Sequence, residues 1–487
     1  MSFLINPKNI KISDIKNKEY SLHPSEHKNV IIKNKNLVSI KDIVDFEDVG
    51  KQIDTSNYVN FTSDYYLGTI SCMNNLIFDS KKSENITSLE FENSKKKLNK
   101  NDLVISRNAT LGKISIIKDN VNLILNGGLS YLRINNELLR YYFMSFFIVD
   151  FGASILKLKT SGGGTQKNAK KEDLLNMKIP FPTKENNKNP EDVKQMVSLI
   201  VRNIIDKEEQ IKLKNNEIDN LIEEELKNNQ KNKNASYLYP KISEVKTNSR
   251  LDTGIYNKKF KENENLILNY SRGFVDLSNE KIITGRTPKD YYYTNVKQKN
   301  TYLWLTPKYI KNREIKSKIY LHTKYPTNLE QNDIIFTAIG TNAQGHMFLY
   351  TGEDKTYINQ NTCAIRVNNK NICNIFTLCF LSSPISKKII KEYTSNGSVP
   401  AIYSKDISML KIPIFEKEYQ NKISKIYFNN IKKNTLDLSN YILKEKLRNQ
   451  ELGIYQLNME LFKLQEKLNL IVQKIIDDEP IDINFSY

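Results

Sequence analysis

The stretch NDLVISRNATLGKISII, residues 101–117, places a short polar segment between two apolar runs. This pattern is typical of two short strands joined by a turn, and Gly112 can supply the positive φ angle that such a turn often requires. A similar stretch, NDIIFTAIGTNAQGHMFLY, returns at residues 332–350. Its return indicates an internal repeat.

Single residues around both stretches support the repeat, because each has a counterpart 233 positions later. The tripeptide KIP at residues 178–180 returns at 411–413 with the same offset. The matching residues are Gly112, Asn126, Arg133, Gly164 and Thr165, which correspond in this order to Gly345, Asn359, Arg366, Gly397 and Ser398. One constant offset over about seventy residues predicts two copies of one domain.

Each copy has a mixed pattern of strands and helices. After the hairpin pattern, YLRI and CAIRV are typical of a further strand, and LLRYYFMSFF and ICNIFTLCFLSS are typical of the helix that follows. Polar loops, TSGGGTQKNAKK and TSNGSVPAIYSK, then lead to a closing strand that ends near a proline. The sequence therefore predicts domains of the α/β or α+β class.

The segment that follows each copy has the periodicity of a long amphipathic helix. In the first segment, Ile204, Ile211 and Ile218 are spaced by seven residues. In the second, apolar residues follow at steps of four and three, at Leu457, Leu461, Leu464, Leu468, Ile471 and Ile475. This heptad spacing predicts that the two helices pair in a coiled-coil-like arrangement, although each helix could instead bury its stripe on its own domain. At about 1.5 Å per residue, the first helix would be about 60 Å long.

Composition narrows the class of function. A chain of 487 residues suggests two or three domains, and a net charge of +18 favours a polyanionic partner such as nucleic acid over a bland excess of surface lysine. The apolar segment at residues 141–156 contains Asp150 and is short for a membrane span, so we expect a buried helix. Residues 1–16 do not show a basic segment followed by an apolar core, so we do not expect export, and the four cysteines form no CxxC pair. These features fit a reduced cytoplasm, with no zinc site and no disulfide framework.

The order of these elements resembles that of the specificity (S) subunits of type I restriction-modification systems, in which a target-recognition domain and a long helix alternate twice. The phrases that carry the resemblance are LVISRNATLGKISII, TSGGGTQ before LLNMKIPFP, ITGRTPKDYY, YLWLTPKYI, SRLDTGIY and IVRNIIDKEEQIKLKNNEIDNLIEEEL. Two stretches depart from the pattern. The first copy has VGKQIDTSNYVNFT in place of a clear counterpart of GRTP, and the second has TAIGTNAQG in place of SRNATLG. These departures concern the DNA target more than the family.

The resemblance implies two homologous target-recognition domains separated by two long antiparallel helices, with pseudo-twofold symmetry. The expected segments are a first domain at 1–188, a spacer helix at 189–230, a second domain at 231–415, a second spacer helix at 416–478 and a tail at 479–487. Two related but unequal domains on a rigid spacer would read two different short DNA sequences separated by a gap of fixed length. Major-groove sites on one face of the duplex lie about 34 Å apart.

Polar loop residues are the candidate DNA contacts, even though most polar loop residues are simply solvated. Arginine reads guanine, asparagine and glutamine read adenine, and basic side chains also bind phosphates. In the first copy the candidates are Arg107, Asn108, Thr110, Gln166, Lys167, Asn168, Lys170 and Lys171. In the second copy they are Arg286, Lys289, Tyr291, Tyr292, Tyr293, Lys297, Lys299, Thr341, Asn342, Gln344, His346, Asn396 and Ser398. Trp304 is expected to belong to the core.

The sequence offers no catalytic motif. It lacks the Asn/Asp-Pro-Pro-aromatic loop of an amino-methyltransferase, the GxxxxGK[ST] phosphate loop and HExxH, and its four histidines are scattered. The resemblance therefore implies a noncatalytic subunit that binds double-stranded DNA and no cofactor, metal or membrane. It would dock two methyltransferase subunits, each with S-adenosylmethionine, and through them a translocase-nuclease. The complex would methylate adenine N6 or cleave unmodified DNA, as in phage defence.

Three alternatives stay open at this point. The chain could be the specificity subunit of a related system in which methyltransferase and nuclease are fused. It could be a coiled-coil adaptor whose paired domains bind protein. It could also be a self-sufficient nuclease with an unrecognised site.

Overall fold

The computed structural model describes residues 4–5, 10–13, 28–94, 96–108, 110–159, 169–232, 240–248, 254–289, 292–311, 313–315, 318–323, 327–340, 345–395, 399–433 and 436–486. The chain forms two compact units. Unit 1 comprises residues 1–209, 432–450 and 459–487, and unit 2 comprises residues 210–431 and 451–458. Each unit contains one copy of the repeat.

The central sheet of unit 1 has four antiparallel strands in the order β4-β10-β7-β8. These strands are β4 (Phe46–Val49), β7 (Leu103–Ser106), β8 (Ile114–Ile116) and β10 (Leu129–Arg133). Every residue of β7 and β8 is buried. The two strands predicted for residues 101–117 are therefore confirmed, and their apolar side chains are part of the core of unit 1.

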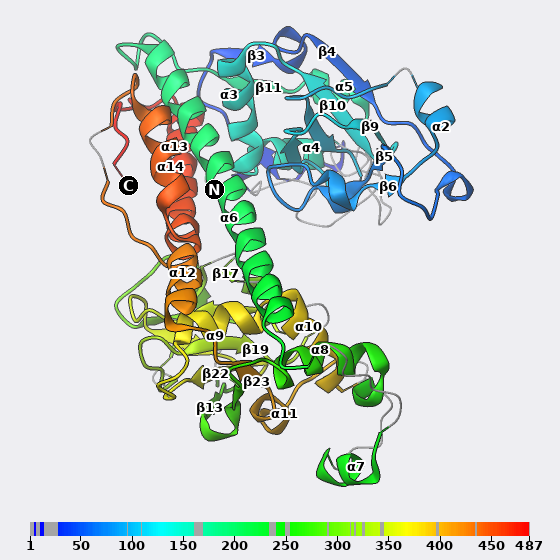
Figure 1. The fold of residues 1–487 in the computed structure, drawn as a ribbon. Coiled ribbons are helices and arrows are strands. Elements are labelled where there is room, and N and C mark those ends of the chain that lie inside the picture. The colour runs from blue at the N-terminus through cyan, green and yellow to red at the C-terminus, as the bar shows by residue number, and fades with distance from the viewer. Residues whose placement is uncertain are drawn as a thin grey trace. The chain divides into compact units, whose positions relative to one another are not determined.

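Smaller sheets and helices complete unit 1 (Figure 1). A second sheet has the order β6-β5-β9, with β5 and β9 parallel. Its strands are β5 (Tyr65–Gly68), β6 (Glu84–Asn85) and β9 (Asn122–Leu125). Two antiparallel pairs join β1 (Leu4–Ile5) to β2 (Asn29–Val30) and β3 (Leu37–Ser39) to β11 (Lys178–Pro180). The short helices are α2 (Ser88–Glu92), α3 (Glu137–Ile148), α4 (Phe151–Lys159) and α5 (Lys171–Leu175).

The apolar segment at 141–156 lies in α3 and α4, which turn sharply at Asp150. No single described helix is both long and apolar enough to cross a bilayer, whereas the bent pair Glu137–Ile148 and Phe151–Leu158 passes that test together by length and composition. Tyr142, Phe143 and Phe146 of α3 are completely buried in the core of unit 1. The prediction of a buried helix is confirmed, with the difference that Asp150 divides it into two.

Unit 2 repeats this architecture. Its central sheet has the order β13-β22-β19-β20, and a second sheet has the order β14-β18-β15-β21 with β15 and β21 parallel. The strands of these sheets are β13 (Lys281–Thr284), β14 (Tyr293–Thr294), β15 (Thr301–Leu305), β18 (Tyr320–His322), β19 (Ile334–Thr337), β20 (Met347–Leu349), β21 (Thr356–Ile358) and β22 (Thr362–Arg366). Two pairs join β12 (Phe274–Asp276) to β23 (Lys411–Pro413) and β16 (Ile310–Lys311) to β17 (Glu314–Ile315).

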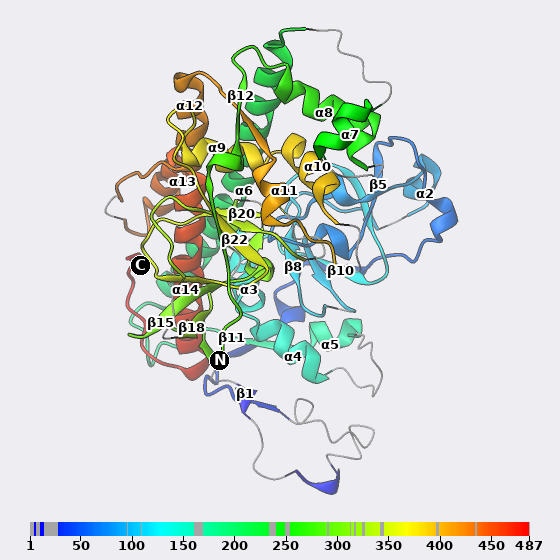
Figure 2. The same ribbon diagram turned by 90° about the horizontal axis from the view of Figure 1, so that it is seen from below.

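Six helices belong to unit 2 alone in the part that the structure describes. They are α7 (Ile242–Asn248), α8 (Lys258–Leu268), α9 (Asn374–Leu381), α10 (Pro384–Tyr393), α11 (Ser404–Ser408) and α12 (Lys417–Tyr427). Helices α8 and α10 lie side by side, as Figures 1 and 2 both show. The order of strands, hairpin, helices and closing strand is the same in both units, which confirms the duplication predicted from the constant offset.

A buried ion pair recurs at the same place in both copies. Arg133 at the end of β10 donates two hydrogen bonds of 2.8 Å to Asp102, which lies just before β7. Arg366 at the end of β22 donates two hydrogen bonds of 2.9 Å to Asp333, just before β19. These bonds raise the pKa of both arginines. Both aspartates are only 1% exposed, so each copy carries its own buried pair between two central strands.

The long segment after the first copy is one helix, α6 (Pro190–Asn228). The segment after the second copy was predicted as one spacer helix over 416–478, but the structure divides it into three. After α12 come α13 (Tyr441–Glu451) and α14 (Ile454–Asp477). One local contact marks the start of α13, where Asp437 accepts hydrogen bonds from the backbone of Ser439 and Asn440. All six apolar residues of the predicted heptad seam lie in α14.

The segment at residues 428–453 contains α13, and its two ends lie close together. The Gly453 amide donates to the Asn429 carbonyl at 2.9 Å, and the Asn429 side chain donates to the Glu451 carbonyl at 2.7 Å. A Cβ atom at Gly453 would lie 2.3 Å from the Asn429 nitrogen and 2.6 Å from the Tyr427 oxygen. Only glycine permits this close approach of two backbone segments.

Within unit 1, α6 and α14 run antiparallel. Lys207 in the middle of α6 contacts Glu460 near the start of α14, and Thr183 before α6 bonds Asp478 after the end of α14 at 2.8 Å. Of the predicted helix-pairing residues, Ile204, Leu464, Leu468, Ile471 and Ile475 lie in one apolar core. The remaining four, Ile211, Ile218, Leu457 and Leu461, are also buried. Their pairing across the two helices stays a prediction.

Helices α6, α13 and α14 enclose a buried ion cluster, which we define as Lys207, Glu445, Arg448 and Glu460. The Lys207 ammonium lies 2.8 Å from Glu460 and donates to the Asn449 side chain at 2.6 Å. Arg448 donates to Glu445 and to Glu460, each at 2.9 Å. Figure 1 shows α13 and α14 side by side. The four side chains are at most 13% exposed, so each charge depends on the others for compensation.

The buried ion cluster predicts acid sensitivity of unit 1. Burial opposes ionisation of Glu460, but hydrogen bonds from Arg448 and the charge of Lys207 outweigh burial and lower its pKa to about 2. The pKa of Glu445 is lowered as well. A lowered folded-state pKa stabilises the fold above the ordinary glutamate pKa, and this stabilisation is lost as the pH falls from about 5 toward 2. We expect a loss of about 2 to 3 kcal/mol.

Urea denaturation followed by circular dichroism at pH 6 and pH 3 measures this loss. Other carboxylates titrate in the same range, so the same series with Arg448→Met is the control. The midpoint should fall more steeply with acid in the wild type than in the variant. Parallel pH dependence of the two proteins would contradict the prediction.

Candidate nucleic-acid interface

The turn between β7 and β8 in unit 1 and the turn between β19 and β20 in unit 2 share two features. Gly112 and Gly345 have φ angles of 79° and 73°, as the sequence predicted for this turn. The Gly112 amide donates to Ser106 at 2.9 Å, and the Gly345 amide donates to Thr337 at 3.1 Å. In unit 1 this hairpin therefore carries the candidate contact residues Arg107, Asn108 and Thr110.

The candidates around this turn in unit 1 differ in their freedom to reach a ligand. The Arg107 guanidinium donates twice to the Ala169 carbonyl, at 3.0 and 2.8 Å, so it fastens the end of the neighbouring loop. Asn108 is half-buried, and its side chain lies against Gly128. Thr110 is exposed, and its carbonyl accepts a hydrogen bond from Ser106.

Two lysines at the start of α5 are also placed in unit 1. The Lys170 side chain is exposed, while its backbone amide donates to Asp173 at 2.9 Å. The Lys171 ammonium lies 2.6 Å from Glu47, and the hydrogen bond to this carboxylate raises the pKa of Lys171. Lys170 is thus available to a ligand, whereas Lys171 is already paired.

The candidates of unit 2 lie on the segment that follows β13 and around the second hairpin. Tyr292 is 72% exposed, whereas the Tyr293 ring stacks on Trp304 with centroids 5.7 Å apart. Lys297 forms an ion pair of 2.6 Å with Asp354. The His346 ring nitrogen Nδ1 lies 3.1 Å from the Ile310 carbonyl, so this imidazole is anchored to the protein backbone.

Nine predicted contacts lie outside the described residues. They are Gln166, Lys167, Asn168, Tyr291, Thr341, Asn342, Gln344, Asn396 and Ser398.

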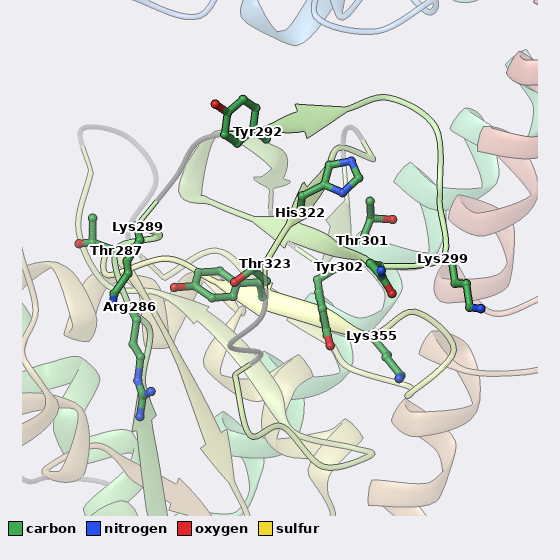
Figure 3. A pocket seen from close by; sticks show the side chains of 12 residues that line it. Arg286, Thr287, Lys289, Tyr292, Lys299, Thr301, Tyr302, His322, Thr323 and Lys355 are labelled. Atoms are coloured by element: carbon green, nitrogen blue, oxygen red, sulfur yellow. The ribbon is translucent and has the colours of Figure 1, made fainter.

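One hollow of about 1050 Å³ brings several candidates of unit 2 together. The predicted residues Arg286, Lys289, Tyr292 and Lys299 line it, and all four come from the stretch 286–299. Figure 3 shows their side chains around the hollow together with those of residues that were not predicted. The other lining residues are Thr287, Asn300, Thr301, Tyr302, His322, Thr323, Lys355 and Tyr357.

The charge of this hollow is strongly positive. Arg286, Lys289, Lys299 and Lys355 contribute four cationic groups, and no carboxylate is among the described lining residues. The nearby Asp354 is already paired with Lys297 at 2.6 Å and Lys318 at 3.4 Å. Lys355 carried no motif signal, because it stands alone before β21 and only the fold places it beside the other lysines.

The structure also supplies the counterpart of Arg286 that the sequence of the first copy lacked. The amides of Gly50 and Lys51 donate to Leu129 and Leu125 at 2.9 and 2.8 Å. The amides of Gly285 and Arg286 donate to Thr362 and Ile358, the matching residues of the repeat, at 2.9 and 3.1 Å. Lys51 therefore corresponds to Arg286. The sequence alone placed the stretch VGKQIDTSNYVNFT at this point but did not pair its residues one by one, and the offset here is 235 in place of 233.

Both glycines before these basic residues are required by close packing. A Cβ atom added to Gly50 would lie 2.1 Å from the backbone oxygen of Asn126. A Cβ atom added to Gly285 would lie 1.9 Å from the backbone oxygen of Asn359. Asn126 and Asn359 are themselves counterparts in the repeat. The pair of glycine followed by a basic residue was therefore the signal that could have identified Lys51.

The described residues give little support for a metal site or for a cysteine nucleophile. Among them, no group of three or more His, Cys, Asp or Glu side chains is arranged to hold a metal ion. Burial raises the pKa of the Cys363 and Cys379 thiols to about 12, which disfavours a thiolate nucleophile.

Comparison with known proteins gives one family match. The model of the type I restriction modification DNA specificity domain matches residues 32–215 and 274–448. No curated protein matches the sequence.

Solved structures of S subunits also resemble the chain. The S subunit of a type I restriction-modification system from M. genitalium has 13% sequence identity and a TM-score of 0.45, with 92% of this chain and 99% of that chain covered. The HsdS subunit from Thermoanaerobacter tengcongensis has 14% identity and a TM-score of 0.28, with 91% and 96% covered.

Proposed function

Because this chain belongs to the type I restriction modification DNA specificity family, we propose that it reads a bipartite, asymmetric DNA site with its two repeated domains. Specificity chains of this family are noncatalytic. The chain would therefore recognise the DNA site, while two methyltransferase subunits with bound S-adenosylmethionine would methylate adenine N6. A translocase-nuclease that joins through them would cleave unmodified DNA.

The observation that carries this proposal is the duplication. The family model matches each copy separately, and each copy builds an equivalent four-stranded central sheet with its own arginine–aspartate pair. The residues that face the candidate interfaces nevertheless differ between the copies, as Lys51 and Arg286 illustrate. Two domains with one scaffold and different surfaces suit two different half-sites.

The helices support the second part of the proposal. The continuous helix α6 contributes residues up to 209 to unit 1 and the following residues to unit 2. At about 1.5 Å per residue, its 39 residues extend about 58 Å. A rod of this length would set the gap between the half-sites and would offer docking surfaces for two methyltransferase subunits.

Mapping of methylated adenines tests the proposed function. Genomic DNA from cells that express this chain with a cognate methyltransferase is compared with DNA from cells that lack the chain. We expect a motif of two short, different sequences at a fixed distance, and we expect it to disappear when the chain is deleted. A motif that persists without the chain, or the absence of any two-part motif, would contradict the proposal.

A further inference from the structure

The hollow of unit 2 has a counterpart in unit 1, but there it is filled. Helix α2 contacts β5 and β9, which correspond to β15 and β21 of unit 2. The Phe91 ring of α2 lies 5.0 Å from the Tyr65 ring, and Phe91 packs in one apolar cluster with Ile124. By strand register, Tyr65 and Ile124 correspond to Tyr302 and Tyr357, which line the hollow in unit 2.

The basic residue of unit 1 that corresponds to Arg286 is already paired with a carboxylate of the same unit. Glu90 of α2 forms an ion pair of 3.1 Å with Lys51, the counterpart of Arg286. Asn122 stands where unit 2 has Lys355, and its side chain donates to the Asp64 carbonyl at 3.2 Å. Thus a carboxylate of the chain itself occupies the anion position in unit 1.

Unit 2 leaves the same position open. Between β18 and β19, its described residues contain no helix equivalent to α2. Lys299 and Lys355 are exposed, and Arg286 presents an exposed guanidinium from the position where Lys51 is paired in unit 1. Tyr292 and Tyr302 also line the hollow and add aromatic surface to it.

From this comparison we propose that the hollow is a phosphodiester-binding seat that only the second domain possesses. The proposal rests on the proposed DNA-reading function and specifies how the two domains share it. Backbone phosphates of the DNA take the place that Glu90 takes in unit 1, held by Arg286, Lys299 and Lys355. The second domain then supplies more of the sequence-independent, salt-sensitive affinity. Binding by the first domain depends more on contacts to base edges.

The salt dependence of DNA binding by the full-length chain tests this seat. Affinity is measured between about 50 and 200 mM salt for a labelled duplex with the mapped motif and for a scrambled duplex. Each lost phosphate contact reduces the slope of log affinity against log salt by about 0.9. The variant with Arg286→Ala, Lys299→Ala and Lys355→Ala should therefore lose about 2 to 3 in slope. It should bind both duplexes more weakly by a similar factor.

Two variants in unit 1 are the matched controls. Lys51→Ala should leave the slope unchanged, because Glu90 already neutralises this ammonium. Glu90→Gln should increase the slope by up to about 0.9, because it releases Lys51. Trp304 fluorescence and circular dichroism verify that each variant is folded. If the triple variant does not fold, the single variants Lys299→Gln and Lys355→Gln at exposed positions should each reduce the salt slope by a smaller amount.

The outcomes separate the seat from the proposed function. If the wild type binds the motif selectively but the variants of unit 2 keep its slope, the seat is wrong and the DNA-reading function stands. A wild type without DNA affinity would overturn both. If pyrophosphate binds the wild type but not the triple variant, and the DNA slope is unchanged, the hollow holds a small phosphate compound and the DNA seat is overturned.

Discussion

Replacement of Arg448 with methionine is expected to lower the free energy of unfolding of unit 1 by about 3 to 5 kcal/mol. Methionine keeps most of the apolar contact of the arginine stem but removes its charge. Glu445 and Glu460 would then share one compensating cation, Lys207, while both carboxylates stay buried. Breaking a buried pair in this way costs far more than removing both partners, because one charge is left without compensation.

Hydrogen exchange locates this effect, and urea denaturation followed by circular dichroism gives its size. Peptides from α13 and α14 should exchange faster in the variant. The matched control is Lys446→Met, on the exposed face of the same helix, which should change stability by no more than about 0.5 kcal/mol. Equal effects of the two substitutions would show that the buried ion cluster does not stabilise the bundle.

Arg366→Met is expected to destabilise unit 2 by a similar amount, about 3 to 5 kcal/mol. Asp333 is 1% exposed and would lose both of its hydrogen bonds to the guanidinium. The loss should separate β22 from the segment before β19, in the middle of the central sheet. Trp304, the only tryptophan of the chain, lies in unit 2, so its fluorescence reports the unfolding of this unit.

Two further arginines calibrate this prediction. Arg272 pairs with Glu416 on the surface of unit 2, where both side chains are more than half exposed, so Arg272→Met should cost about 1 kcal/mol or less. Arg133→Met, the equivalent change in unit 1, should cost less than Arg366→Met because Arg133 is 29% exposed. If Arg272→Met shifts the fluorescence midpoint as far as Arg366→Met, burial is not the cause of the effect.

The sequence predicted those parts of the fold that depend on local pattern. The hairpin of β7 and β8 has an apolar run on each side of Gly112, and turn formation requires only these neighbours. The same turn before each hairpin places Asn101 and Asn332 at φ angles of 72° and 75°, a conformation that asparagine tolerates better than most residues. The heptad spacing from Leu457 to Ile475 likewise predicted α14 from its own residues.

Other parts depend on contacts between distant residues. Residues 428–452 contain neither proline nor glycine, the two strongest local signals for the end of a helix. The break arises because Gly453 packs on Asn429 and because Asn203 and Lys207 of α6 bind α13. The hollow is of the same kind, since Lys355 joins Arg286 and Lys299 only through the register of β15 and β21. Of the twenty-one residues named as DNA contacts from sequence, the four that line this hollow come from one stretch, 286–299, and no spacing in the sequence links that stretch to residues 322, 323, 355 and 357, which line the hollow as well.

The two ends of the segment 428–453, which we call the arm, are held together, so this segment is a site where insertions and deletions should be tolerated. Because its two ends are hydrogen-bonded to each other, residues between them can change in length without moving α12 relative to the first turn of α14. A relative could carry a longer arm here, or none, and keep the flanking helices in place. Loss of the arm would remove Glu445 and Arg448 and leave Lys207 of α6 paired with Glu460 of α14 alone, so a chain without it should keep both of these opposite charges or lose both. Positions 207 and 460, more than two hundred residues apart in the sequence, are thus expected to change together where the arm is absent.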